Sequence, residues 1–293
     1  QASSGCENSP ARFNYTGKSK AAMTDLKKRM EVALAAAKKA GELTLEYFQK
    51  GIEVEFKADS SPVTEADRNS EALLIELLEG EFPTDAFLGE ESGERPGDSG
   101  YRWVLDPIDG TRSFVQGVPL YGVLVGLEDP DGQAVLGVIN LPALGETLVA
   151  AAGEGCYHNG SSANGARASV SGVSDLAAAG VVYTGFETFR MSGTLGVHSL
   201  LGDRVKVLRS WGDCYGHLLV ATGRVEAMLD PVLSRWDIVP LKPIVEEAGG
   251  VFTDWQGNPG IDGSSGISTN AALADEIRSI ISAAGTESVD SPN

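Results

Sequence analysis

Residues 103–114, WVLDPIDGTRSF, run from an apolar segment into two aspartates that stand three positions apart, Asp106 and Asp109. The apolar segment predicts a buried strand, and the first aspartate ends it. Pro107 fixes the backbone between the two acids, and Gly110 permits a turn that a side chain would forbid. This arrangement predicts that three oxygen donors point to one side: the carboxylates of Asp106 and Asp109 and the carbonyl of Ile108.

Two further acids stand at comparable places in the sequence. Glu90 follows the apolar run AFLG (86–89), and Asp237 opens the helical pattern in WDIVPLKPIVEEAGG (236–250). Each acid alone has an ordinary structural explanation, since strand-end aspartates form turns, glutamate pairs are solvated, and aspartate or threonine caps helices. Grouped together, however, the four carboxylates would repel one another and raise one another's pKa.

A hard divalent cation resolves this repulsion. Mg²⁺ prefers oxygen ligands and commonly accompanies phosphate substrates. Two such ions would neutralise the four carboxylates, so that a phosphate dianion could approach, and a pair about 4 Å apart suits in-line displacement at phosphorus. The acids therefore predict a magnesium site that acts on a small phosphomonoester.

The composition of the 293-residue chain limits its partners. Its net charge of −18 disfavours nucleic acid and anionic membranes, both of which bind basic surfaces. No apolar run approaches the roughly 18 residues that a membrane helix needs. The three cysteines, Cys6, Cys156 and Cys214, are far apart, so we expect neither a disulfide framework nor a zinc cluster. These features favour a reduced, cytoplasmic location, or a plastid if residues 1–22 belong to a transit segment.

The order of predicted helices and strands divides the chain into two halves. We expect an N-terminal α+β half over residues 23–155 with most of the acids, and a C-terminal α/β half over residues 156–285. The segments 1–22 and 286–293 are expected to be loose tails. Three of the predicted helices matter below: Thr24 or Asp25 to Lys50, 188–200, and Asp237 to Gly249.

Three of these motifs together resemble the successive signatures of a known family. GEESG (89–93), DPIDGT (106–111) and WDIVPLKPIVEEAGG (236–250) are similar, in order and spacing, to those of the inositol-monophosphatase family of Mg²⁺-dependent, Li⁺-sensitive phosphatases. The resemblance covers residues 24–284 and implies an α/β (α+β) fold, a layered α-β-α-β-α sandwich with its site between the halves. It also implies a homodimer. The aspartyl-phosphate phosphatases are a poorer match, because their paired aspartates are two positions apart.

The resemblance implies a ligand set for each metal ion. Glu90, Asp106 and the carbonyl of Ile108 would hold the first ion. Asp106 would bridge to a second ion, which would be held by Asp106, Asp109 and Asp237. A third, weaker ion would be supported by Asp67.

The same resemblance implies the catalytic roles. Glu90 with Thr111 would orient and activate the attacking water, and Asp109 belongs to the same catalytic group. The backbone of Gly110 and Thr111 would bind phosphate oxygens at a helix N-terminus. Lys57 matches a lysine of the family's mobile loop, although a plain surface lysine explains it equally well. Water would attack directly, without a phospho-enzyme.

The stretch WGDCYGHLLVATGR (211–224) resembles the histidinol-phosphate phosphatases within this family. Inositol monophosphatase itself has small neutral residues where Asp213 stands, and a glutamate where Asp230 stands. A cationic leaving group would gain charge-assisted hydrogen bonds from such acids, so we expect Asp213 and Asp230 to bind the amine or imidazole of histidinol. The alternative is that Asp213 only caps its helix. Thr184 falls where the family contacts a substrate hydroxyl.

The leading hypothesis is therefore Mg²⁺-dependent hydrolysis of L-histidinol phosphate to L-histidinol and phosphate, a step of histidine biosynthesis. An inositol monophosphatase or a broad-specificity sugar-phosphate phosphatase is the alternative within the same class. A third hypothesis is a non-catalytic regulatory binding protein that keeps the fold. It is disfavoured because such a protein would be free to lose an acid, and all four are present.

Overall fold

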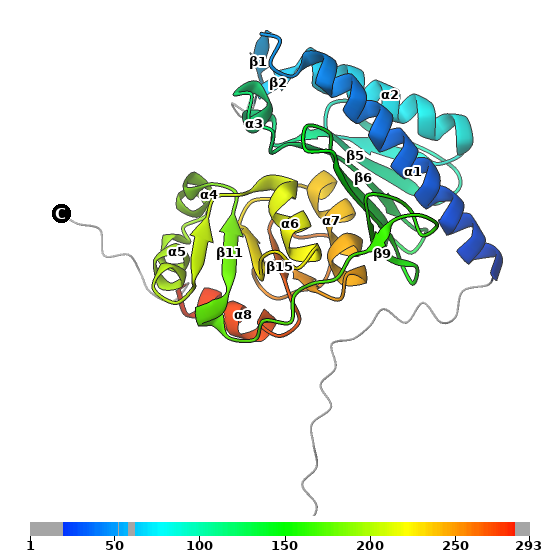
Figure 1. Cartoon of the computed structure of the whole chain (residues 1–293). Coiled ribbons are helices and arrows are strands. Elements are labelled where there is room, and N and C mark those ends of the chain that lie inside the picture. Colours follow the sequence, from blue (N-terminus) through cyan, green and yellow to red (C-terminus); the bar gives the residue numbers. More distant parts are fainter. Residues whose placement is uncertain (1–19, 52, 58–61, 285–293) are drawn as a thin grey trace, which may run out of the picture.

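The computed structural model describes residues 20–51, 53–57 and 62–284, and it is built around two large sheets with helices packed on them (Figure 1). The predicted tails lie outside this part of the chain except for residues 20–22, and Cys6 lies outside it as well. The first sheet has eight strands in the order β10-β9-β8-β7-β6-β5-β3-β4. Its members are β3 (Ala86–Gly89), β4 (Gly93–Arg95), β5 (Arg102–Asp109), β6 (Gly122–Glu128), β7 (Ala134–Leu141), β8 (Glu146–Ala151), β9 (Gly155–His158) and β10 (Ala166–Arg167).

The second sheet has five strands in the order β12-β11-β13-β15-β14. Its strand β11 runs parallel to β12 and β13, whereas β15 is antiparallel to β13 and β14. A separate two-stranded sheet pairs β1 with β2. The bounds of these strands are β11 (Gly180–Tyr183), β12 (Val207–Arg209), β13 (Ala227–Asp230), β14 (Val251–Thr253), β15 (Gly266–Thr269), β1 (Val54–Phe56) and β2 (Pro62–Thr64).

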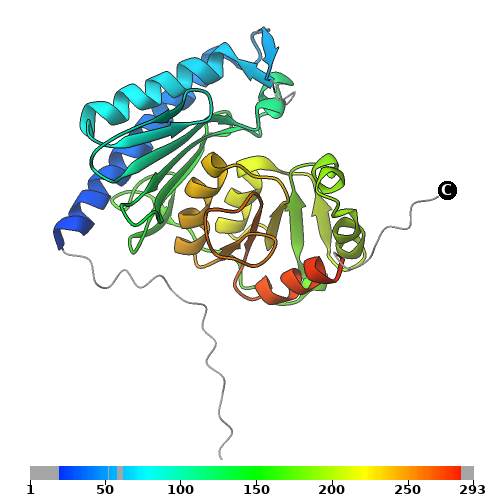
Figure 2. The same cartoon turned by 180° about the vertical axis from the view of Figure 1, so that it is seen from behind.

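Helices pack on both faces of each large sheet. Helices α1 (Lys20–Tyr47) and α2 (Glu65–Glu81) cover the outer face of the first sheet, and α6 (Asp213–Ala221) and α7 (Arg235–Glu247) lie between the sheets. Helices α5 (Leu195–Gly202) and α8 (Ala274–Ala284) cover the far side of the second sheet, as the reverse view also shows (Figure 2). This is the layered α-β-α-β-α sandwich, an α/β fold, that the resemblance implies. Short helices complete the chain: α3 (Thr111–Val115), α4 (Phe186–Met191) and η1 (Leu176–Ala178).

Several elements differ from the sequence-based prediction. The first helix begins at Lys20 and ends at Tyr47, so the caps predicted at Thr24 and Asp25 are wrong. The single helix predicted over 188–200 is two helices, because Gly193 between them adopts the left-handed conformation with φ +73°. Strand β15 was not predicted. None of the described helices has the length and apolar character that a membrane span requires.

Two glycines let α7 approach the first sheet closely. Gly126 of β6 and Gly137 of β7 are directly paired across the two strands. A Cβ atom on Gly137 would lie 1.9 Å from the carbonyl oxygen of Pro240 in α7, and one on Gly126 would lie 2.8 Å from the nitrogen of Pro240. The helix backbone therefore rests directly on the sheet at this pair, and this contact fixes the height of α7 above the strands.

We predict that Gly137→Ala destabilises the protein by about 1–3 kcal/mol, because α7 must move away from β7 to admit the methyl group. The matched control is Gly80→Ala in α2, where a Cβ would meet nothing within 4 Å. The control should be neutral or stabilising by up to about 1 kcal/mol, since alanine favours helix. Urea unfolding of the two variants measures both effects, and equal stability of the two would contradict the close contact.

Candidate active site

The predicted pair of strand-end aspartates lies at the end of β5. The strand was expected to stop at Asp106, but it continues to Asp109 through a shift of register against β6. Pro107 lies in this irregular stretch, beyond the last residue of β5 that pairs with β3, so the missing N–H breaks no ladder there. The backbone N–H of Ile108 donates to Oδ1 of Asp106 at 3.0 Å and fixes its side chain.

The third acid arrives on α7. This helix begins at Arg235 rather than at Asp237, and Asp237 is its third residue. The backbone N–H of Ser234 donates to Oδ2 of Asp237 at 2.7 Å in a capping box. The capping explanation is therefore correct for Asp237, but it is incomplete, because carboxylate oxygens of Asp106, Asp109 and Asp237 all lie within 4.8 Å of one another.

Asp109 also joins the two halves of the molecule. Its Oδ2 accepts the backbone N–H of Cys214 at 2.5 Å, and Cys214 lies in the first turn of α6. A carboxylate at a helix N-terminus is favoured by the partial positive charge of the first N–H groups. This bond places the end of β5 against the helix that carries Asp213.

Asp106 is buried, Asp109 and Asp237 are half-buried beside it, and the pKa values of all three are raised. Burial and the charge of Asp237 raise the pKa of Asp109 to about 7, and burial with the charges of Glu90 and Asp230 raises the pKa of Asp237 to about 7. The pKa of Asp106 is raised still further by burial and by the charges of Glu90, Asp109 and Asp237. The cluster therefore carries negative charge that the chain itself does not neutralise.

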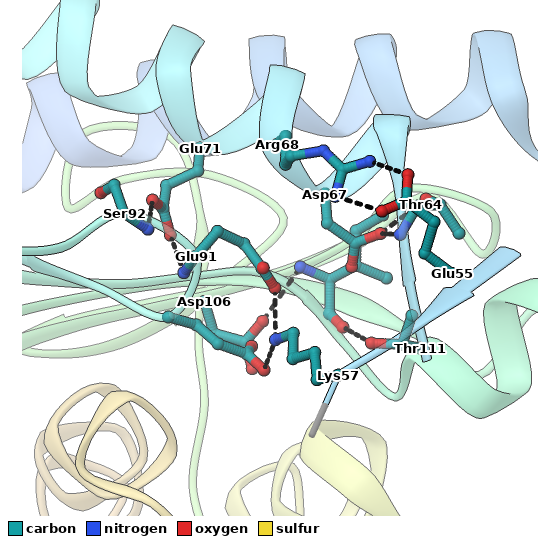
Figure 3. A network of polar contacts seen from close by, with 12 residues as sticks. Glu55, Lys57, Thr64, Asp67, Arg68, Glu71, Glu91, Ser92, Asp106 and Thr111 are labelled. Atoms are coloured by element: carbon teal, nitrogen blue, oxygen red, sulfur yellow. Dashed lines mark hydrogen bonds and ion pairs between the residues drawn. The ribbon is translucent and has the colours of Figure 1, made fainter. Parts of the chain in front are cut away.

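Glu90 lies beside this cluster, at the end of β3. After the effect of burial, the charge of Glu90 is the largest cause of the raised pKa of Asp106, and the two side chains are in hydrogen-bond contact. Lys57 Nζ donates to Oε1 of Glu90 at 2.8 Å and to Oε1 of Glu91 at 2.6 Å (Figure 3). Partial burial lowers the pKa of Lys57, but these two contacts outweigh it and raise that pKa above its usual value. In this structure, Lys57 is thus not a plain surface lysine.

Asp67 and Thr111 lie near Asp106 and Lys57 (Figure 3). Asp67 is 2% exposed, and its Oδ2 accepts both the backbone N–H and the hydroxyl of Thr64 in the capping box of α2. Burial raises the pKa of Asp67, the contacts with Thr64 oppose this, and the charge of Glu90 adds to it. The hydroxyl of Thr111 donates to the carbonyl of Ile108 at 2.9 Å. Thr111 opens α3 directly after Gly110, whose φ is +83°.

A second group of polar residues lies where the parallel strands of the second sheet end. Because β11 is parallel to both β12 and β13, their carboxyl ends meet at one edge of the sheet. Thr184 follows β11, Asp230 ends β13, and Asp213 lies four residues after β12. The hydroxyl of Thr184 donates to Oδ2 of Asp230 at 2.6 Å and accepts the backbone N–H of Asp213 at 3.1 Å.

The carboxylate of Asp213 has no part in capping α6. The N-cap is Gly212, which makes no side-chain cap bond, and Asp213 follows it with φ +54°. A Cβ atom on Gly110 would lie 3.0 Å from Oδ2 of Asp213, so this carboxylate is beside the turn that follows Asp109. Burial, followed by the charges of Asp109 and Glu187, raises the pKa of Asp213 to about 8. The capping alternative for Asp213 is therefore wrong.

Asp230 is buried in the same region. Its side chain is 2% exposed, and among the described residues its Oδ1 has no hydrogen-bond partner, while Oδ2 is held by Thr184. Burial raises its pKa well above the usual value, the bond from Thr184 opposes this, and the charge of Asp213 adds to it. Asp213 and Asp230 thus form a second region of negative charge, and the charge of Arg112 opposes the raised pKa of Asp213 only in part.

Glu71, a residue of α2 that contacts the loop after Glu90, was not predicted from its sequence pattern. Glu71 is 2% exposed, and its oxygens accept the backbone N–H groups of Glu91 and Ser92. The signal was present, because Glu71 follows Asp67 by four residues and precedes the buried Leu74 by three, on the helix face that packs inward. The N–H of Cys214 was also missed, since a backbone contact between distant segments leaves no trace in side-chain type.

The donor set fits a divalent metal ion. The donors are carboxylate oxygens of one buried and two half-buried aspartates, and the crowding of these like charges raises their pKa values. Hard cations such as Mg²⁺ take this kind of ligand. The four acids that the sequence predicted, Glu90, Asp106, Asp109 and Asp237, are thus brought together by β3, β5 and α7.

Comparison with known proteins agrees with this geometry. A sequence model described as the inositol monophosphatase family matches residues 25–286. A histidinol-phosphatase of Chlorobaculum parvum is 45% identical over 87% of this chain and 96% of the relative, and one of Mycobacterium tuberculosis is 37% identical over 84% and 95%. A solved structure of an IMPase from Thermotoga maritima has a TM-score of 0.79 at 28% identity, and the match covers 88% of this chain and 98% of that one.

The match spans both sheets and every acid of the cluster, and the relatives are covered almost end to end. The chain belongs to the inositol monophosphatase family, whose members are metal-dependent phosphatases.

Proposed function

We propose that the protein hydrolyses L-histidinol phosphate to L-histidinol and phosphate, with Mg²⁺ at the carboxylate cluster. The observation that carries this proposal is the pair of acids with raised pKa, Asp213 and Asp230, beside a cluster suited to divalent cations. A phosphomonoester with a cationic leaving group complements this arrangement, because its amine or imidazolium would supply the charge that the second region lacks. The names of the relatives from Chlorobaculum and Mycobacterium support the same substrate.

The metal ligands that we propose are those that the family resemblance implies. Glu90, Asp106 and the Ile108 carbonyl would hold one Mg²⁺, and Asp106, Asp109 and Asp237 would hold a second, with Asp67 beside a weaker third. The ions would neutralise the cluster, polarise the phosphoryl group and acidify bound water. The carbonyl of Ile108 keeps a second lone pair for this purpose, since a carbonyl oxygen has two and Thr111 uses one.

The chain's own groups then position the reactants. The hydroxyl of Thr111 donates a hydrogen bond to the carbonyl of Ile108, so its oxygen is free to accept a hydrogen bond from the attacking water. The Glu90 carboxylate would take the proton that this water loses. Backbone N–H groups of Gly110 and Thr111, at the start of α3, would bind phosphate oxygens. Water would attack phosphorus directly as the P–O bond to the alcohol breaks.

The leaving group would lie on the second half of the molecule. Asp213, Asp230 and Thr184 would bind its amine or ring, and three exposed apolar side chains follow the same strand ends: Phe186, Trp211 and Val232. These side chains offer an apolar surface to an imidazole ring at the edge where the acids lie. An inositol ring carries hydroxyls only, so it would leave the two acids without a cation. Inositol phosphate hydrolysis is therefore the second candidate, and it is favoured by the family as a whole and by the Thermotoga structure.

Phosphate release from histidinol phosphate and from inositol 1-phosphate tests the proposal. With Mg²⁺ we expect a strong preference for histidinol phosphate, and Asp213→Asn should lower its kcat/KM about tenfold, because a charge-assisted bond of about 1.5–3 kcal/mol is lost. Asparagine tolerates the positive φ of Asp213, so the backbone should not change. Asp175→Asn, at a helix cap of the second half, is the matched control. Preference for inositol phosphate in the wild type would refute the substrate assignment.

Asp106→Asn separates function from folding. We expect this variant to lose activity, because both proposed metal ions share Asp106, while the melting temperature without metal stays equal or rises, because one of the repelling charges is gone. Asp254→Asn is the control, since Asp254 accepts two backbone N–H groups in a turn outside the cluster and should affect stability only. A sharply lower melting temperature of Asp106→Asn would instead mean that Asp106 is a structural cap.

The stability of the metal-free protein should fall as pH rises. The pKa values of Asp109 and Asp237 are raised from 3.8 to about 7, so between these values the folded state holds protons that the unfolded state releases. Unfolding then becomes easier with increasing pH across this window. Melting curves in EDTA from pH 5 to pH 8 should show the fall, and Mg²⁺ should reverse it by binding the ionised carboxylates. A rise in stability with pH in EDTA would contradict the raised pKa values.

The homodimer that the resemblance implies also remains a proposal. Light scattering of the purified protein decides between one and two copies.

A further inference from the structure

We infer that Glu71 is a positioning residue that holds the metal-binding carboxylate of Glu90 in place. The inference rests on the proposed function, because it gives Glu71 a part in the same metal-dependent site. Glu71 lies on α2, two turns into the helix, and does not belong to the cluster of acids whose oxygens converge. Its effect would pass through the backbone around Glu90.

The carboxylate of Glu71 accepts two consecutive backbone N–H groups. Oε2 accepts the N–H of Glu91 at 2.9 Å, and Oε1 accepts the N–H of Ser92 at 2.8 Å (Figure 3). The side chain is 2% exposed, so neither oxygen is shared extensively with bulk water. Hydrogen bonds to a charged acceptor are about twice as strong as neutral ones, and two of them fix the turn in direction as well as in place.

The residue before this pair is held from the opposite side. The N–H of Glu90 donates to the carbonyl of Leu105 in β5 at 3.1 Å. Three consecutive N–H groups, those of Glu90, Glu91 and Ser92, are thus fixed by β5 on one side and by Glu71 on the other. The side chain of Glu90 starts from a backbone that is held on both sides, and the same β5 carries Asp106 at the next position after Leu105.

The local sequence is shaped around this contact. A Cβ atom on Gly89 would lie 2.5 Å from the carboxyl carbon of Glu71, so a side chain at position 89 would displace the carboxylate from the loop. Glycine directly before Glu90 therefore lets a buried acid of α2 reach the two N–H groups that follow. Asp67, one turn earlier on α2, faces the same region, and its pKa responds to the charge of Glu90.

A glutamine at position 71 could accept only one of the two hydrogen bonds that Glu71 accepts from Glu91 and Ser92. Its amide has one accepting oxygen and one donating nitrogen, so one of the two N–H groups would face another donor. The loop would have to shift to relieve this contact, and Glu90 would shift with it. Substitution of a residue that orients a metal ligand without binding the metal itself typically lowers metal affinity or activity 10- to 100-fold.

The test compares Glu71→Gln with a matched control, Glu247→Gln. Glu247 also accepts two backbone N–H groups, those of Gly153 and Gly155, each at 2.8 Å, in a turn of the first sheet that carries no proposed ligand. The melting temperature is measured while MgCl₂ is titrated into the metal-free protein, so the readout does not depend on activity. We expect the half-saturating Mg²⁺ concentration to rise about tenfold or more in Glu71→Gln and to stay within about twofold in Glu247→Gln. Both variants should lose some stability without metal.

A purely structural role would give a different result. Glu71→Gln would then lose stability as Glu247→Gln does, with an unchanged half-saturating Mg²⁺ concentration, and the inference would be overturned. If Glu71→Gln fails to fold, Glu71→Asp replaces it, because the shorter acid keeps the charge but cannot reach both N–H groups. An unchanged Mg²⁺ response in Glu71→Asp would equally overturn the inference. Wild-type protein that binds Mg²⁺ but releases no phosphate from any phosphomonoester would refute the proposed function alone.

Discussion

The close contact between α7 and the first sheet is the constraint on which the site depends. Gly126 and Gly137 remove the side chains that would otherwise separate the helix from the strands, and Pro240 lies directly on them. This contact brings the first turn of α7, with Asp237, to the end of β5. Without it, the carboxylates of Asp109 and Asp237 would be too far apart to share a cation. The proposed metal site thus depends on the close packing of α7 against the first sheet.

The convergence has an electrostatic cost in the metal-free protein. Three carboxylates that would be ionised in water, one buried and two half-buried, have oxygens within 4.8 Å of one another, and burial together with their mutual repulsion raises their pKa values. Such clusters are retained at functional sites because the same field binds a divalent cation strongly. The chain reduces the cost locally, since Ser234, Cys214 and Ile108 each donate a backbone N–H to one of the acids. These bonds orient the carboxylates without neutralising them, which leaves the charge available for the metal.

Much of this site could be predicted from the sequence, because four acids recur at strand ends and at a helix start, and their combination is more specific than any one of them. The pair Asp106 and Asp109 was visible from spacing alone, and the layered fold followed from the resemblance of three motifs. What could not be predicted depends on contacts between backbone and side chains that are distant in sequence. The role of Glu71 requires the loop after β3 to pass over α2, and the bond from Cys214 to Asp109 spans 105 positions. The break between α4 and α5 at Gly193 was not predicted, because buried apolar residues, Phe189 before it and Val197 after it, stand at helical spacing on both sides of the glycine.

In the proposed reaction, the phosphoryl group and the leaving group would lie on different halves of the molecule. The first sheet and α7 carry the acids that would act on phosphate, while the parallel strand ends of the second sheet carry Thr184, Asp213 and Asp230. The two sets meet at one seam, where Asp109 accepts the N–H of Cys214 and Asp213 lies beside Gly110. Substitutions at the strand ends can therefore change which alcohol is accepted and leave the metal ligands in place. A family with one phosphatase site and several substrates is the result expected of such a division, because specificity lies in loops that the rigid sandwich only positions.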